Sequence, residues 1–245
     1  MKKNEKVLDV PVDIIGVSDI ILDLPVYIEQ NIKMTLTSIN PQILLVAQKN
    51  DIVKKFLIQS THRFPDGIGV IKVSKWTKGN ITERVAGIDV MDHVLRYAAS
   101  NQLSVYFYGA KEEVVRQAVI NLKKEHKNLI VAGFTDGYTS KKEAELVKEI
   151  NDKQADILFV ALGSPRQEEW LARNMEQLNC KVFQTIGGSL DVKSGFTKRA
   201  PEIWIKLNLE WVYRSFSNPK RLNRIFQVPE FICKSLIWRL KHKES

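Results

Sequence analysis

The sequence predicts an α/β fold in which a mostly parallel, Rossmann-like sheet is flanked by helices. Short apolar runs that end in small or turn-forming residues alternate along the chain with longer, charged amphipathic stretches. This alternation of strand, turn and helix is typical of parallel sheets, because neighbouring parallel strands are joined through helices. The length of 245 residues suits one such domain with an appendage.

The predicted elements follow one another from residue 34 onward. Met34–Ile39 is expected to be a strand that runs into Asn40-Pro41, and residues 42–48 are expected to form a helix. Further strands are expected at residues 105–108, 129–133, 157–162 and 182–186, and further helices at residues 111–125 and 141–153. In sheets of this kind ligands bind at the carboxyl ends of the strands. Candidate functional residues should therefore lie directly after the apolar runs.

Four segments occupy such positions. They are Ser38-Ile39-Asn40, Tyr108-Gly109-Ala110, residues 163–168 and residues 187–191. In the third segment Pro165 begins a predicted helix, whose free N–H groups could receive a phosphate. In the fourth, Gly187 and Gly188 allow a ligand to approach the backbone closely. Each segment taken alone is also compatible with an ordinary turn.

Asp66 lies in a fifth segment, Pro65-Asp66-Gly67, which is ordinary turn chemistry and by itself favours a turn residue over a catalyst. Several motifs are missing from the chain: a P-loop, a GxGxxG fingerprint and an Asp-x-Asp pair for a divalent metal. Cys180 and Cys233 form neither a CxxC pair nor a disulfide framework, and the four histidines have no metal-ligand spacing. We therefore expect a reducing compartment and no metal, so that a bound nucleotide diphosphate would rely on backbone amides and arginines.

The positive charge is concentrated at the end of the chain. The whole sequence has 37 Lys and Arg against 28 Asp and Glu, a net charge of +9, and residues 196–245 account for +7 of it. The same residues contain three of the five tryptophans. We therefore expect an α/β core over residues 1–195 and a basic, Trp-rich helical appendage over residues 196–245. A basic, aromatic segment indicates a polyanion or an anionic membrane surface as partner.

The sequence leaves open whether the end of this appendage lies on a membrane or docks on the core, and its charge also raises the question of nucleic-acid binding. Ile232, Leu236 and Leu240 recur every four residues among lysines and arginines, which is typical of an interfacial helix on anionic lipid and also of a terminal helix docked on a core. The apolar runs are too short for a membrane-spanning helix. A nucleic-acid-binding module would also be basic. We expect no nucleic-acid partner, because the appendage has no recognisable nucleic-acid motif and follows a chain patterned as an enzyme.

An ordered set of motifs extends along nearly the whole chain. It comprises Ser38-Ile39-Asn40, residues 65–69, 83–89, 108–110, 136–138, 161–168, 187–192 and 198–201, and Leu209-Glu210-Trp211-Val212-Tyr213-Arg214. With these motifs the sequence resembles the WecG/TagA/CpsF family of bacterial glycosyltransferases. Agreement at so many positions in the same order is not explained by chance.

The resemblance implies transfer of a sugar from a UDP-sugar to a polyprenyl-diphosphate-linked acceptor on the cytoplasmic face of the bacterial membrane. The best-known members add N-acetylmannosamine, or its uronic acid, to N-acetylglucosaminyl-diphospho-undecaprenol, with inversion and without a metal. Their products enter teichoic acids, capsules or exopolysaccharides. The resemblance thus implies a peripheral membrane enzyme without a cofactor, and a homo-oligomer is compatible with it. Another UDP-hexose donor, or a catalytically idle member, remains an alternative, although the presence of Asp66, Asn40 and Gln167 argues against the latter.

The resemblance also implies roles for single residues. Asp66 corresponds to the proposed general base, which takes the proton of the acceptor hydroxyl as it attacks the anomeric carbon. Asn40 is expected to hydrogen-bond a sugar, with Ser38 beside it. The other expected substrate-binding residues are Tyr108, Gly109, Gly163, Ser164, Gln167, Gly187 and Gly188.

Five charged residues complete the set. Arg84 and Asp89 are either ligand contacts or partners in a salt bridge that holds their loop. Arg214, Arg221 and Arg224 match basic positions of the family's C-terminal appendage, where guanidinium groups would bind the diphosphates. The alternative for these three arginines is a solvated basic face.

Overall fold

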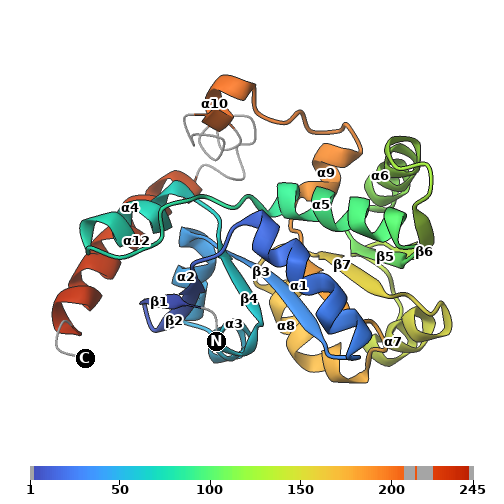
Figure 1. The fold of residues 1–245 in the computed structure, drawn as a ribbon, viewed down its shortest axis with the longest axis horizontal. Helices are drawn as coiled ribbons and strands as arrows, with labels where there is room; N and C mark the ends of the chain where they lie inside the picture. Colours follow the sequence, from blue (N-terminus) through green and yellow to red (C-terminus); the bar gives the residue numbers. More distant parts are fainter. Residues whose placement is uncertain (1–2, 207–212, 214–222, 243–245) are drawn as a thin grey trace.

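The computed structural model describes residues 3–206, 213 and 223–242, and a six-stranded parallel sheet lies at its centre (Figure 1). The strands are β3 (Met34–Ile39), β4 (His62–Pro65), β5 (Ser104–Gly109), β6 (Ile130–Thr135), β7 (Ile157–Ala161) and β8 (Val182–Thr185). Their order across the sheet is β4-β3-β8-β7-β5-β6, and every neighbouring pair is parallel. The predicted α/β fold with a parallel sheet is therefore confirmed.

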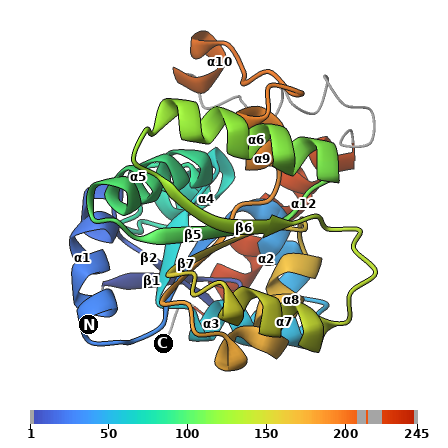
Figure 2. The ribbon, with the colours of Figure 1, turned by 90° about the vertical axis from the view of Figure 1, so that its right-hand side faces the viewer.

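Helices cover both faces of this sheet (Figure 2). One face carries α1 (Val17–Glu29), α5 (Gly87–Ser100), α6 (Glu112–Glu125) and α9 (Ser189–Lys193). The other carries α2 (Pro41–Ala47), α3 (Asp51–Gln59), α7 (Glu143–Asp152) and α8 (Arg166–Asn174), the last followed by the short helix η1 (Met175–Gln177). Outside these layers lie α4 (Ile68–Trp76), α10 (Glu202–Lys206) and α12 (Asn223–Lys241). The layers explain why β7, in the middle of the sheet, is apolar throughout, since both of its faces are buried.

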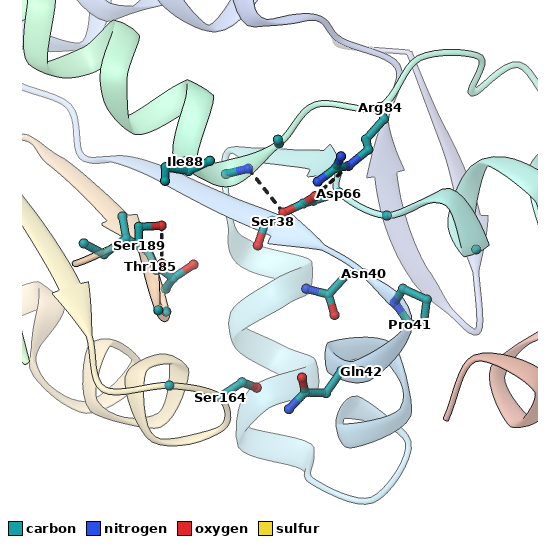
Figure 3. Close-up of a pocket in the computed structure, with 18 of the residues that line it drawn as sticks. Ser38, Asn40, Pro41, Gln42, Asp66, Arg84, Ile88, Ser164, Thr185 and Ser189 are labelled. Atoms are coloured by element: carbon teal, nitrogen blue, oxygen red, sulfur yellow. Dashed lines mark hydrogen bonds and ion pairs between the residues drawn. The ribbon is translucent and has the colours of Figure 1, made fainter. Parts of the chain in front are cut away.

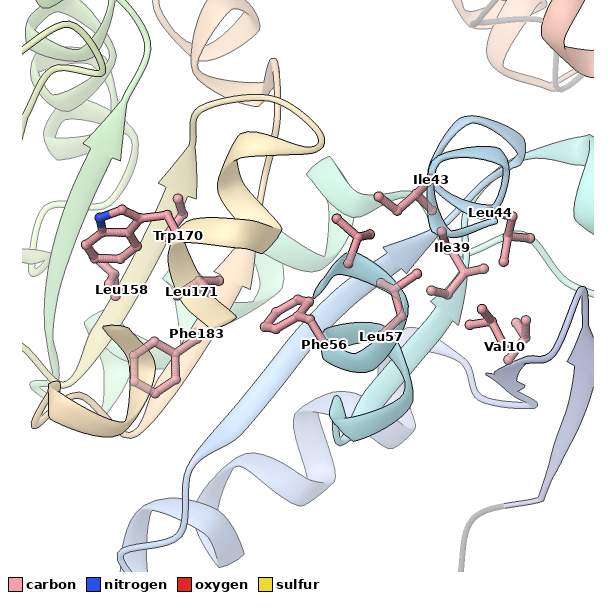
Figure 4. Close-up of a cluster of buried hydrophobic side chains, with 14 of the residues drawn as sticks. Val10, Ile39, Ile43, Leu44, Phe56, Leu57, Leu158, Trp170, Leu171 and Phe183 are labelled. Atoms are coloured by element: carbon pink, nitrogen blue, oxygen red, sulfur yellow. The ribbon is translucent and has the colours of Figure 1, made fainter. Parts of the chain in front are cut away.

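Successive side chains of a strand enter opposite cores. Leu158 of β7 belongs to the cluster shown in Figure 4, together with Phe183 and Trp170. Phe159, the next residue of β7, belongs to the cluster on the other face, where it stacks on Phe107 with ring centroids 5.3 Å apart. This alternation is the two-residue period of a β-strand. The two cores hold the carboxyl ends of the strands in one layer.

A two-stranded antiparallel hairpin precedes the sheet and is fastened to its edge. It consists of β1 (Asn4–Val7) and β2 (Val10–Asp13). The fully buried Asp13 accepts hydrogen bonds from the Arg63 backbone N–H at 2.7 Å and from its guanidinium group at 2.8 Å. A buried ion pair needs this degree of hydrogen bonding to offset desolvation. The hairpin therefore supports β4, the edge strand of the sheet.

The C-terminal helix α12 docks on the core beside α2 and α4 (Figure 1). Phe231 is fully buried and belongs to the core cluster, and Ser235, one turn later, is also buried. The indole N–H of Trp238 donates to Asp9 at 2.9 Å. Of the two structures left open by the sequence, the docked helix is thus present. In the part of the chain that the structure describes, no helix has both the length and the apolarity to cross a membrane.

The predicted strands are confirmed in position to within two residues at each end. The sequence analysis did not identify the hairpin, α1, α3, β4, α4 or α5. Of these, β4 matters most for the site, because it ends at Pro65, directly before Asp66.

Candidate active site

A cavity of about 300 Å³ lies at the carboxyl ends of β3, β4, β7 and β8, which are neighbours in the sheet (Figure 3). This is the place where parallel sheets bind ligands. The expected site residues that line it are Ser38, Asn40, Asp66, Arg84, Gly163, Ser164, Gln167, Gly187 and Gly188. Segments as far apart in the chain as residue 38 and residue 188 thus form one site.

Several helices begin at this cavity. Residues in the first turn of α2, α4, α5, α8 and α9, or directly before it, are part of the lining. The first turn of α2 is fixed by its cap, because the Asn40 side chain accepts a hydrogen bond from the Ile43 N–H at 3.1 Å. Pro41 follows at the first helical position, where no N–H is needed. Helix N-termini carry partial positive charge and unpaired N–H groups, so the cavity is suited to an anionic ligand.

Asp66 is held at the wall of the cavity by hydrogen bonds of both its backbone and its side chain. Its backbone N–H donates to Ile39 O at 2.7 Å, which continues the pairing of β4 with β3. Its carboxylate accepts from the Gly87 N–H at 3.2 Å and from Arg84 Nε at 3.4 Å (Figure 3). The next residue, Gly67, has φ = +129°, a conformation that a side chain would strain. The 23% exposed carboxylate is therefore oriented, yet accessible to a ligand.

Arg84 and Asp89 do not pair with each other. Arg84 pairs with Asp66 inside the cavity lining, whereas Asp89 accepts from Arg199 at 2.6 Å and is not among the lining residues. Each forms a salt bridge with a partner outside their loop, and Arg84 also lines the cavity, while the predicted contact of either residue with a ligand is not tested. The Asp89–Arg199 pair joins the first turn of α5 to the beginning of the appendage.

Gln167 connects two of the turns that line the cavity. It is buried in the first turn of α8, and its Oε1 accepts from the Gly187 N–H at 3.1 Å. Its Nε2 donates to Glu168 Oε1 at 2.7 Å. The turn after β7 and the turn after β8 are thereby fixed relative to each other.

The sequence model of the family described as "Glycosyl transferase WecG/TagA/CpsF family" matches residues 5–245. The chain belongs to this family. It is 37% identical over 205 residues to an N-acetylglucosaminyldiphosphoundecaprenol N-acetyl-beta-D-mannosaminyltransferase of Bacillus subtilis (strain 168), covering 84% of this chain and 80% of that protein. Proteins of the same name from Bacillus spizizenii and Staphylococcus aureus (strain MW2) are each 34% identical, covering 89% and 86% of this chain and 83% and 82% of their own length. The expected family is confirmed, and the protein is a glycosyltransferase.

In this glycosyltransferase two further expected site residues, besides Asp89, lie outside the cavity lining. Tyr108 is buried and its ring lies 4.9 Å from that of Trp170. Gly109, at the end of β5, has its backbone against β7, where a Cβ atom would come within 2.4 Å of the Ala161 carbonyl carbon. The structure therefore gives both residues a packing role, and their predicted contact with substrate is not tested.

Some residues that line the cavity were missed by the sequence analysis. Thr185 ends β8 and is 3% exposed, and within the described part of the protein its hydroxyl has no hydrogen-bond partner. The rule that directed attention to the ends of strands could have identified it. Gln227 and Val228 of α12 also line the cavity. No local signal marks them, because they reach the site only through the docking of α12.

The three expected arginines of the appendage cannot be compared with the cavity side chain by side chain, because none of their side chains is among the described parts of the structure. Arg214 and Arg221 lie outside the described residues. The backbone of Arg224 is in the first turn of α12, and its side chain is outside the description. Since α12 borders the cavity three residues later, at Gln227, the backbone of Arg224 lies close to the site. The predicted roles of all three stay predictions.

Proposed function

We propose that this glycosyltransferase moves a sugar, with N-acetylmannosamine as the first candidate, from a UDP-sugar to a polyprenyl-diphosphate-linked N-acetylglucosamine. The observation that carries the proposal is the oriented Asp66 carboxylate in a cavity where several helix N-termini meet. The names of the relatives support the acceptor and the transferred sugar, since each describes a mannosaminyl transfer to N-acetylglucosaminyl-diphospho-undecaprenol. Another UDP-hexose as donor is the alternative within the same reaction class.

The chemistry requires a base and a stabilised leaving group. In our proposal Asp66 takes the proton of the acceptor hydroxyl while the hydroxyl oxygen attacks the anomeric carbon. The bond between that carbon and the UDP oxygen breaks, and attack from the opposite side inverts the anomeric configuration. A carboxylate fixed by the Gly87 N–H and by Arg84 needs no reorganisation for this step.

The departing UDP needs positive charge around its diphosphate. The first turns of α4, α5 and α8 border the cavity, and the N-terminus of a helix carries partial positive charge. Arginines 214, 221 and 224 would add guanidinium groups suited to bidentate phosphate binding. We propose that these groups carry out the transfer without a metal. Among the residues that the structure describes, no group of three or more His, Cys, Asp or Glu could hold a metal ion.

We also propose that the enzyme works at an anionic membrane surface through α12. The helix buries Phe231 and Ser235, and its opposite side exposes Ile237 and Leu240, 54% and 70% accessible, among basic residues. This pattern supports shallow insertion into the headgroup region. Sedimentation with anionic and with zwitterionic vesicles tests it: wild type should bind the anionic vesicles, and an I237S/L240S variant should bind them at least about tenfold more weakly, as expected for two lost apolar anchors. Equal binding by both proteins would contradict the proposal.

The transfer itself is tested with a synthetic lipid-diphosphate-N-acetylglucosamine acceptor and a panel of UDP-sugars, with product mass as the readout. UDP-N-acetylmannosamine should yield an acceptor heavier by one N-acetylhexosamine, with the same rate in the presence and absence of EDTA. The anomeric configuration of the product, measured by NMR, tests inversion. Transfer from a different UDP-sugar would correct the donor, and transfer from none would refute the assigned acceptor.

A further inference from the structure

Glu168 is a buried carboxyl group that the proposed reaction leaves unused. It follows Gln167 in the first turn of α8, is 2% exposed and does not line the cavity. Burial is the main influence on the pKa of its carboxyl group and raises it, while the Gln167 amide acts in the opposite direction. A buried carboxyl beside an active site is costly and calls for a physical reason.

The contacts of Glu168 lead into the cavity through one side chain. Its Oε1 accepts the hydrogen bond from Gln167 Nε2 at 2.7 Å, and Gln167 Oε1 accepts from the Gly187 N–H at 3.1 Å. The chain Glu168–Gln167–Gly187 thus runs from behind the turn after β7 to the turn after β8. Both Gln167 and Gly187 line the cavity.

The order of donors and acceptors along this chain fixes the orientation of the Gln167 amide. An amide has one donating and one accepting end, and rotating it by 180° exchanges them. With Nε2 toward Gly187, two N–H groups would face each other, and Oε1 would face the oxygen of Glu168. Only the observed orientation satisfies both neighbours, so a carbonyl-type acceptor at Glu168 selects it. An apolar side chain at position 168 would leave only the Gly187 N–H to favour the observed orientation of the amide.

The second carboxyl oxygen indicates the form in which Glu168 acts. Within the described residues Oε2 is buried and makes no hydrogen bond of ordinary geometry. Burial is the largest influence on this carboxyl group and raises its pKa, although the Ser164 hydroxyl acts on the group and lowers the pKa. The neutral acid is therefore favoured over a carboxylate whose charged oxygen is shielded from solvent. The neutral acid still has Oε1 to accept from Gln167. A glutamine at position 168 has the same shape and the same accepting oxygen.

We propose that Glu168 is a positioning residue, which locks the Gln167 amide so that the turns after β7 and β8 face the donor substrate in one fixed arrangement. This role rests on the proposed function only for the nature of the ligand, because the two hydrogen bonds that form the lock are made between residues of the protein itself. With the lock in place, Gln167 has one N–H and one lone pair left for a polar group of the ligand.

Hydrogen exchange of the Gly187 amide, measured by NMR on the ligand-free protein, tests the lock directly. E168M should raise that exchange rate about five- to tenfold, the equivalent of one weakened hydrogen bond. E168Q, which retains the acceptor, and E169Q, a matched change at the neighbouring carboxylate, should leave it within about twofold. If E168M does not fold, E168D withdraws the carboxyl by one methylene and should change the rate in the same direction. Unchanged Gly187 exchange in the folded variant, or E168Q behaving like E168M, would overturn the proposal.

Titration with UDP adds a readout that a merely structural role would not move. E168M should weaken UDP binding about five- to tenfold in the wild-type background and not at all in a Q167A background, because Glu168 acts only through Gln167. Equal losses in both backgrounds would contradict the positioning role. If the wild-type protein binds no UDP while the exchange result holds, the proposed donor class fails and the lock stands.

Discussion

Replacement of Asp66 by asparagine separates catalysis from folding at this site. The change keeps the size of the side chain and one accepting oxygen, so either the Gly87 N–H or Arg84 retains its partner. What is lost is a partly exposed ion pair, 3.4 Å long, with Arg84 17% and Asp66 23% accessible. Fully exposed pairs contribute about 0.2 to 1 kcal/mol to stability, and this mostly buried pair is expected to contribute somewhat more. An amide cannot take the proton of the acceptor, and a positioned base contributes about 100- to 10,000-fold to the rate.

The two effects therefore differ in size, with about 3 to 5 kcal/mol expected in the activation barrier and about 1 to 2 kcal/mol in the free energy of unfolding. Initial rates of sugar transfer to the lipid-linked acceptor measure the first quantity, and urea unfolding measures the second. Glu83→Gln is a matched control, an acid-to-amide change at an exposed position of the loop that carries Arg84. Turnover of D66N above about one tenth of wild type would refute the assignment of Asp66 as the base, since even a weak general base contributes more.

Three further predictions concern packing and titration. Phe231→Ala, at a fully buried position of α12, should lower the free energy of unfolding by about 3 to 5 kcal/mol, while Leu240→Ala on the exposed side should change it by about 0.5 kcal/mol or less; urea titration compares them. Burial raises the pKa of Glu168 above its ordinary value of 4.5, so its contribution to stability is fully present below that value and is lost as the pH rises through the pKa of the folded state. Thermal unfolding at a series of pH values measures this dependence, and E168Q should remove the part that Glu168 contributes. Burial raises the pKa of the Cys180 thiol to about 12, so a thiol reagent at neutral pH should modify only the exposed Cys233 in the native protein. Mass spectrometry should show both cysteines modified after unfolding. Rapid labelling of Cys180 in the native protein would contradict its burial.

Much of the sheet could be predicted because its strands are locally distinctive. The strand at 157–161 is buried on both faces, so every residue is apolar, and Gly163, two residues later, indicates where it ends. β4 could not be identified in this way. It has only four residues, lies at the edge of the sheet and includes His62 and Arg63, whose polar groups are satisfied by Asp23 and Asp13 from distant segments. A short strand stabilised by such partners has no apolar pattern of its own.

This gap affected the interpretation of Asp66. Pro65-Asp66-Gly67 has the composition of a turn, and the local pattern alone favours that role. In the structure Pro65 is the last residue of β4, so Asp66 lies at the carboxyl end of a strand that pairs with β3. The resemblance to the family indicated the residue, and the pairing of the two strands explains why its carboxylate reaches the cavity.

By itself, the sequence determined the fold class, the family and most of the residues at the strand ends, because these depend on local periodicity and on motifs read in order along the chain. The tertiary structure alone decided which charged groups meet. Arg84 pairs with Asp66, 18 residues away, and Asp89 with Arg199, 110 residues away, rather than with each other. It also brought Gln227 of α12 to the cavity. Such contacts follow from how the helices pack on the sheet. The position of a charged residue in the sequence does not specify which partner its side chain will meet after packing.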